Sequence, residues 1–462
     1  MTHTPLSTRP SRPTLRQLLA TASSLLCLLL TTDSALALDG LILDSATKKP
    51  LPGAMVTFKD TVIKTDEQGR YHFDTAADTS SLAGKQVLAR AIGHGRAAAN
   101  LTADSATVAD ILLAPQQVNG LYLSFYGIGS KELRHKALDL IDRTKLNALV
   151  VDIKSDKGMI PYPSNIVLAQ EIGARTVTTV RDMPAQLKEL KAKGIYMIAR
   201  IVTFKDDPLA KARPELAVKK TDGSLFRDRE GLSWVDPSIP EVWQYNIDIA
   251  AEAAAMGFDE IQFDYVRFPD TVGLKFAVEN KEANRVAAIT GFLGLAHERL
   301  KSYNVFIGAD IFGYVAWNEN DTFIGQTLDG VAANVDYLCP MLYPSGFMFG
   351  IPNYRNPVAH SYEIVNHTLT EAIKRSKISP QRYRPWLQAF KDYAFDKRKF
   401  EAAEVSSQIK ASEDAGASGW LLWNPRNAYT DAGIPLDKAS SRVTKQTATA
   451  PGTYAESTAV AK

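Results

Sequence analysis

From residue 119 to residue 423, short apolar runs of strand length alternate with longer segments that have helical periodicity. The runs are five to eight residues long and nearly all apolar, which is typical of parallel strands that are buried on both faces. Eight of them are predicted to be strands, at 121–126, 148–153, 195–202, 260–266, 305–311, 336–343, 385–390 and 419–423.

The segments between these runs predict amphipathic helices, so the chain has an α/β pattern. Eight strand–helix units over about 310 residues favour a (β/α)8 TIM barrel. A doubly wound open sheet is the alternative, but no Gly-x-Gly-x-x-Gly motif follows the first strand and no P-loop occurs. The expected helices are 131–143, 183–193, 241–256, 277–302, 322–333, 357–375 and 401–415.

Residues 39–115 have a different rhythm, in which turn signals such as Pro50-Leu51-Pro52-Gly53 separate short apolar runs. This rhythm predicts a small all-β sandwich domain in front of the barrel. The barrel is then expected to cover residues 118–430. Residues 437–462 are rich in Ser, Thr, Ala and Lys without periodicity, and are expected to form a disordered tail.

Residues 1–37 have the three parts of a secretory signal peptide. Three arginines lie among the first 16 residues, a leucine-rich apolar stretch follows, and Ala35-Leu36-Ala37 places small residues at a cleavage site. The apolar stretch is short for a transmembrane span, although an uncleaved membrane anchor is the alternative. We therefore expect a secreted or periplasmic protein.

Charge and cysteine content narrow the classes of function. The 462-residue chain has a formal net charge of +2, and residues 1–37 contain three Arg and one Asp, so 50 basic and 50 acidic residues remain after their removal. This balance does not predict the basic surface that nucleic-acid binding requires. The rest of the chain has no second long apolar segment that would predict an integral membrane span. Cys339 is then the single cysteine, which excludes an intramolecular disulfide and requires a large core for stability.

The segment 257–269 combines several polar side chains at one predicted strand end. Apolar and polar residues alternate up to Asp264, then Tyr265 and Arg267 follow, and Pro269 stops the strand. Barrel and doubly wound folds carry their chemistry at the carboxyl ends of such strands. Asp264 is therefore our leading candidate for a catalytic nucleophile.

Glycoside hydrolysis uses two carboxyl groups that flank the bond to be cleaved. Asp310 ends the next strand among apolar residues that would raise its pKa, and is the first candidate for the general acid/base. Asp152, at the end of the second strand, is its main competitor and could instead hold substrate hydroxyls. Asp236, in the long loop 206–237, is a third candidate.

Aromatic, amide and basic side chains accompany these carboxylates. Aromatic rings stack on the C–H faces of sugars, while polar groups hold the hydroxyls. Structural explanations compete: a strand-end Asp is often a helix N-cap or an ion-pair partner, and Trp423 and Tyr343 also fit a core. The expected substrate-binding residues are Tyr126, Arg200, Lys205, Trp234, Asp236, Tyr265, Arg267, Tyr343, Gln388, Trp423 and Asn424.

Other hydrolase chemistries have little support. None of the seven histidines falls at a predicted strand end, no His-x-x-x-His pair occurs, and one cysteine cannot form a thiolate cluster. The sequence contains no Gly-x-Ser-x-Gly motif, which argues against a serine hydrolase. We therefore expect neither a metal nor another cofactor.

The N-terminal region carries a recognisable set of motifs. Thr65-Asp66-x-x-Gly69-x-Tyr71-x-Phe73, together with Pro50-Leu51-Pro52-Gly53, resembles the carboxypeptidase-regulatory-like sandwich that many secreted enzymes contain. The resemblance implies a spacer or a binding accessory.

The barrel region has its own motifs, which occur in order at 118–124, 147–154, 199–206, 233–237, 257–269 and 340–345. With them, residues 118–430 resemble a bacterial glycoside-hydrolase-like family known as DUF4015, a domain of unknown function. The resemblance implies a TIM barrel and glycosidase activity. Phe263-Asp264-Tyr265 is similar to the nucleophile strand of α-glycosidase and α-galactosidase-type enzymes, but neither the acid/base nor the sugar is implied.

The sequence thus predicts a secreted or periplasmic, metal-independent glycoside hydrolase. Its expected substrate is a polysaccharide, an oligosaccharide or a cell-envelope glycan. A non-catalytic carbohydrate-binding or cell-envelope scaffold protein is the alternative from another class, because one fold can host both. A transglycosylase would use the same residues with a sugar as the acceptor.

Overall fold

The computed structural model describes residues 1, 37–74, 84–102 and 110–437. The expected signal peptide up to residue 36 and the expected tail from residue 438 lie outside the described residues. Within the described ranges, no helix is both long enough and apolar enough to cross a membrane.

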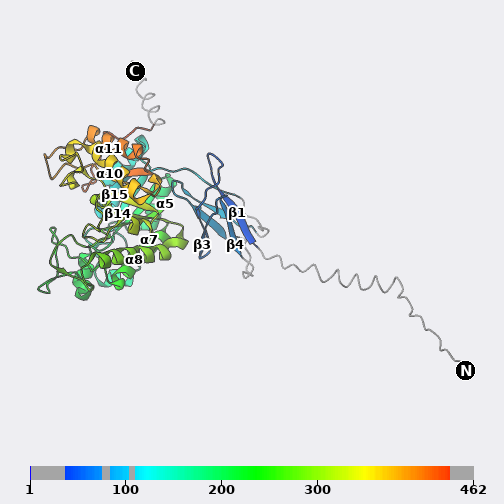
Figure 1. Ribbon diagram of the computed structural model, residues 1–462, viewed down its shortest axis with the longest axis horizontal. Coiled ribbons are helices and arrows are strands. Elements are labelled where there is room, and N and C mark those ends of the chain that lie inside the picture. Colours follow the sequence, from blue (N-terminus) through cyan, green and yellow to red (C-terminus); the bar gives the residue numbers. More distant parts are fainter. Residues whose placement is uncertain (2–36, 75–83, 103–109, 438–462) are drawn as a thin grey trace, which may run out of the picture.

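Eight parallel strands close into a barrel, in which every strand neighbours the next one along the chain and the last strand pairs with the first. Helices surround this barrel, and the N-terminal strands (blue) stand beside it (Figure 1). The expected (β/α)8 fold is confirmed. Its strands are β8 (Val118–Leu123), β9 (Ala148–Lys154), β10 (Tyr196–Val202), β12 (Glu260–Asp264), β14 (Phe306–Phe312), β15 (Tyr337–Met341), β16 (Trp386–Gln388) and β17 (Gly419–Trp423).

Apolar side chains on both faces of the strands explain why the sequence forms a barrel. All residues of β9 and β10 are buried, as expected for strands between a barrel interior and a ring of helices. Alternate residues such as Val150, Ile198 and Leu421 fill the interior, while Leu149, Ile201 and Leu422 pack toward the helices. These side chains make the interior a packed core, which also contains the polar Glu260 and Gln262 of β12.

The main helices follow the expected pattern. α7 begins with Pro240 at its first turn and ends where Gly257 adopts a left-handed conformation with φ 104°. The longer helices are α3 (Lys131–Arg143), α5 (Met183–Ala192), α7 (Pro240–Met256), α8 (Glu282–Leu300), α10 (Ser361–Ser376) and α11 (Ala402–Asp414). The shorter elements are α2 (Phe125–Gly129), α4 (Val167–Glu171), α6 (Asp207–Ala212), α9 (Leu328–Ala332), β11 (Lys219–Lys220) and β13 (Leu274–Lys275).

The helix expected at 322–333 is wrong over its first half, because only α9 forms. Thr322 and Phe323 have φ values of 56° and 61°, which a right-handed helix cannot accommodate. Asp321 stabilises this turn by accepting hydrogen bonds from the backbone N–H groups of Phe323 and Gly325, and by pairing with Arg285. The hydrogen bonds of this polar turn therefore stabilise a non-helical backbone where the apolar pattern predicts a helix.

Several strands also end earlier than the sequence predicts, and two of these ends have a clear local cause. β8 ends at Leu123, because Ser124 caps α2 by accepting a hydrogen bond from the N–H of Gly127. Tyr126 therefore lies in α2, not at a strand end, and is 62% exposed. β12 stops at Asp264 instead of continuing to residue 266, because Tyr265 has a left-handed φ of 48°.

The N-terminal region is all-β, as expected. One sheet has the order β4-β1-β7 and the other the order β3-β2-β5-β6, with a separate apolar core. The strands are β1 (Ala37–Asp44), β2 (Met55–Phe58), β3 (Thr61–Lys64), β4 (Arg70–Asp74), β5 (Gln86–Arg90), β6 (Arg96–Asn100) and β7 (Ile111–Leu113).

This region contacts the end of the barrel where the strands begin. Arg96 forms an ion pair with Asp259, immediately before β12. The N–H of Gly93 donates a 3.3 Å hydrogen bond to the hydroxyl of Tyr337, the first residue of β15. The N-terminal sheets therefore lie at the opposite end of the barrel from the carboxyl ends of the strands.

Candidate active site

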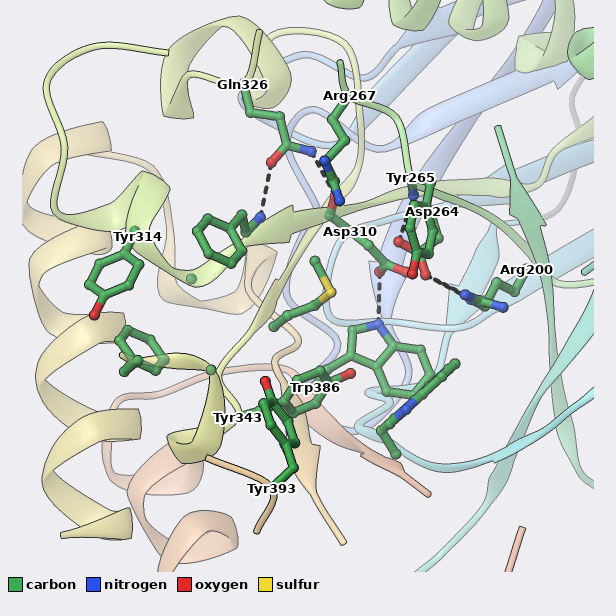
Figure 2. A pocket seen from close by; sticks show the side chains of 16 residues that line it. Arg200, Asp264, Tyr265, Arg267, Asp310, Tyr314, Gln326, Tyr343, Trp386 and Tyr393 are labelled. Carbon is green, nitrogen blue, oxygen red and sulfur yellow. Dashed lines mark hydrogen bonds and ion pairs between the residues drawn. The ribbon is translucent and has the colours of Figure 1, made fainter. Parts of the chain in front are cut away.

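A cavity of about 240 Å³ lies at the carboxyl ends of the barrel strands. Its walls come from the ends of β10, β12, β14, β15, β16 and β17 and from the loops that follow them, so residues far apart in the sequence meet there (Figure 2). Seven of the sequence-predicted site residues line it, namely Arg200, Asp264, Tyr265, Arg267, Asp310, Tyr343 and Trp423.

Asp264 is held in a fixed orientation at the edge of this cavity. Its Oδ2 accepts hydrogen bonds from Nε of Arg200 at 2.8 Å and lies 2.6 Å from Nη2 of the same side chain. Its Oδ1 accepts a 2.6 Å hydrogen bond from the N–H of Tyr265, the residue with the left-handed backbone. A cation and a backbone donor therefore fix both oxygens of a carboxylate that faces the cavity.

Asp310 faces Asp264 from the neighbouring strand (Figure 2). Its Oδ1 accepts a 2.8 Å hydrogen bond from Nε1 of Trp386, and its Oδ2 has no partner in the described part of the chain. Complete burial, with the nearby charge of Asp264 as the second cause, raises the pKa of Asp310 well above its ordinary value. This rise favours the protonated form of Asp310, which is the form that a general acid needs.

Arg200 connects this pair to two further carboxylates. Its guanidinium lies 2.6 Å from Oδ1 of Asp152 and 2.8 Å from Oδ1 of Asp156. The other oxygen of Asp152 accepts hydrogen bonds from the hydroxyl of Tyr122 at 2.7 Å and from a backbone N–H at 3.1 Å. Burial raises the pKa of Asp152 to about 6, although Arg200 opposes the rise. Asp152 thus positions Arg200, which in turn positions Asp264.

A second cavity, of about 310 Å³, lies beside the first. Asp152, Asp156 and the exposed Tyr126 line it, and Trp423 lines both cavities. The Trp423 ring stacks on Tyr122, with centroids 3.9 Å apart and an interplanar angle of 20°. Asp152 therefore opens to a different cavity from Asp264 and Asp310.

Trp234 and Lys205, two of the expected site residues, do not line the first cavity but contact residues that do. Tyr265 and Arg267 line the cavity, and the Arg267 guanidinium lies 5.0 Å from the ring of Trp234. Trp234 and Lys205 are buried behind this layer. Lys205 is paired there with Glu230 at 2.8 Å, and lies 5.1 Å from the Tyr265 ring.

Three other expected site residues hold loops together. The amide of Gln388 donates to Oγ of Ser345 at 2.7 Å, and that of Asn424 donates to the carbonyl of Ala389 at 2.7 Å. Asp236 accepts hydrogen bonds from backbone N–H groups of its own loop and of the segment before α8. None of the three lines either cavity.

Several cavity residues were not expected from the sequence. Trp386 is two residues before Gln388, so strict alternation along β16 places both on the inner face and could have identified it. Most of the others are aromatic residues in loops, where periodicity carries no signal. The missed residues are Phe312, Tyr314, Gln326, Phe347, Trp386 and Tyr393.

Comparison with known proteins identifies the barrel. Residues 120–429 match DUF4015, which is described as "Putative glycosyl hydrolase domain". The chain belongs to the DUF4015 family. The sequence resemblance to that family is thus confirmed over about two thirds of the chain. A search of curated protein sequences returns no match.

Solved structures extend this comparison. The DUF4015 chain is 43% identical to a hypothetical protein from Ruminiclostridium thermocellum, over 41% of this chain and 96% of that one, with a TM-score of 0.38. It is also similar to the PgaB (BpsB) glycoside hydrolase domain from Bordetella bronchiseptica, at 14% identity over 70% of this chain and 100% of that one, with a TM-score of 0.52. The second likeness shows a common fold.

Proposed function

We propose that this DUF4015 protein is a secreted or periplasmic glycoside hydrolase that acts on a polysaccharide or a cell-envelope glycan. The observation that carries the proposal is the pair of facing carboxyl groups in one cavity, which differ in their surroundings. Arg200 contacts Asp264 with two nitrogens, whereas Asp310 is buried with a pKa well above its ordinary value. Carboxyl groups in such contrasting environments are what acid/base hydrolysis of a glycosidic bond requires.

In the proposed reaction, Asp310 donates its proton to the oxygen of the leaving sugar as the glycosidic C–O bond breaks. Asp264 attacks the anomeric carbon and forms a glycosyl ester. Asp310, now ionised, then removes a proton from water, which attacks the same carbon and releases Asp264. Arg200 keeps Asp264 pointed at the sugar throughout both steps.

The aromatic walls of the cavity fit a carbohydrate substrate. Tyr314, Phe347, Tyr393 and Trp423 line the cavity, and such rings pack against the C–H faces of pyranoses. Arg267 adds a partly exposed guanidinium that can hold hydroxyls. Secretion would bring the site to glycans outside the cytoplasm.

Incubation of the purified protein with a panel of bacterial polysaccharides tests the proposal. We expect new reducing ends from at least one glycan with the wild type and none with Asp264→Asn. The matched control is Asp270→Asn, which changes an exposed carboxylate beyond the same strand and should retain activity. Binding on a glycan array without new reducing ends would instead identify a carbohydrate-binding scaffold.

A further inference from the structure

The barrel interior below the active site contains an unusual stack of polar residues. Glu260, Gln262 and Asp264 alternate along β12, so all three project toward the barrel axis. Asp264 reaches the cavity, and the other two lie in deeper layers. Glu260 accepts hydrogen bonds from Arg384 at 2.5 Å and from the hydroxyl of Tyr196 at 3.0 Å.

Several atoms of this stack have no hydrogen-bond partner among the described residues. They are both amide atoms of Gln262, Oε1 of Glu260 and Oδ2 of Asp310. Each of these side chains is at least 99% buried. Leaving one buried polar group unsatisfied costs about 1–3 kcal/mol, so a native interior pairs such groups with protein or with ordered water.

These groups converge on one region of the axis. Gly308, on the neighbouring strand β14, has no side chain to fill the space between them. A Cβ at that position would lie 3.0 Å from Oε1 of Glu260, 3.5 Å from Sγ of Cys339 and 3.6 Å from Cγ of Gln262. Asp310 is the next inward-facing residue of β14, two positions closer to the cavity. The unsatisfied atoms thus belong to adjacent layers of the same axis.

We propose that water bound on the barrel axis hydrogen-bonds to Gln262 and links the carboxyl group of Asp310 to Glu260. Buried water in proteins makes about three hydrogen bonds to polar groups of this kind. Gln262 is then a positioning residue, which acts on the reaction through the proton of Asp310. This inference rests on the proposed role of Asp310 as the general acid.

The consequence for pH dependence follows from the charges that face Asp310. Bound water stabilises the ionised carboxylate, so its removal disfavours ionisation and moves proton loss to higher pH. The negative groups nearby also disfavour ionisation of Asp310, whereas the cations favour it. The titratable and charged groups that face Asp310 are Asp264 and Glu260 from β12, Arg200 from β10, Cys339 from β15 and Tyr343 after β15. Arg384, before β16, pairs with Glu260.

A high-resolution crystal structure of the full chain is the first test. We expect a water peak within hydrogen-bond distance of the Gln262 amide and of either Glu260 or Asp310. An axis without such a peak would overturn the proposal. The presence or absence of this water does not depend on whether Asp310 is the general acid. Activity measurements on Asp310→Asn test that role separately.

The second test is the pH–rate profile of Gln262→Met, which keeps the side-chain volume but removes both hydrogen-bonding atoms. The alkaline limb should move upward by about one pH unit with KM little changed. Ile198→Val, an apolar change in the same interior, is the control and should leave the limb in place. An unmoved limb in Gln262→Met would refute the positioning role, even if the water is present.

Discussion

Replacement of Arg200 by methionine tests the idea that one cation organises the whole site. The guanidinium lies within 2.8 Å of three carboxylates, those of Asp152, Asp156 and Asp264. Removing one partner of a buried ion pair leaves the other charge uncompensated, at a cost of about 3–5 kcal/mol. Because domains are stable by only about 5–15 kcal/mol, Arg200→Met should lose a large fraction of the free energy of unfolding.

Asp152 contributes directly to the pH dependence of this loss. Its pKa is about 6 in the folded protein against 3.8 for an unperturbed Asp, so the folded state binds this proton more tightly. The group's contribution to stability is therefore fully present below pH 3.8 and is lost as pH rises through 6. That loss is about 3 kcal/mol in the wild type and larger without Arg200, which opposes the shift.

Urea unfolding of both proteins at about pH 4.5 and pH 7.5 measures the effect. We expect the destabilisation by Arg200→Met to be clearly larger at the higher pH, where Asp152 must carry a charge. Arg181→Met, a change at an exposed arginine, should cost less than about 0.5 kcal/mol at either pH. A loss below about 1 kcal/mol for Arg200→Met, or an equal loss at both pH values, would refute the reasoning.

Three further predictions concern single side chains. Trp386→Phe removes the N–H that donates a hydrogen bond to Asp310, so the pKa of Asp310 should rise further. The alkaline limb of the kcat/KM profile should then move to higher pH, and a shift to lower pH would contradict this. Lys154→Met leaves Asp206 buried without its cation, and urea unfolding should show a loss of about 3–5 kcal/mol; a loss under 1 kcal/mol contradicts it. Tyr393→Ala removes a 57% exposed ring of the cavity rim, so KM should rise about five- to tenfold with kcat nearly constant, and an unchanged KM would exclude the ring from binding.

The architecture could be predicted from the sequence because each barrel strand is buried on both faces. Continuous apolar runs and amphipathic helices then repeat in a regular order, which few folds share. Asp264 and Asp310 could be placed together for the same reason, since adjacent parallel strands bring their carboxyl ends to one edge. The contact of Arg200 with Asp264 also follows from strand adjacency.

The remaining site residues depend on loops, which periodicity does not describe. Gln388 ends β16 and Asn424 follows β17, but their amides satisfy backbone and side-chain groups of neighbouring loops instead of facing the cavity. The apolar pattern places Tyr126 in a strand, but Ser124 ends that strand early by capping a helix. Tyr314 and Tyr393 reach the cavity only through the three-dimensional course of their loops.

The rate of reducing-end release by Asp264→Asn, relative to the wild type on the same glycan, tests the central claim most directly. The variant should unfold at a similar temperature to the wild type and to Asp270→Asn, so that any loss reports on chemistry. We predict a fall in kcat of about a thousandfold or more, because the nucleophile is removed while the binding surface remains. A rate within tenfold of the wild type would show that Asp264 is not the catalytic carboxylate.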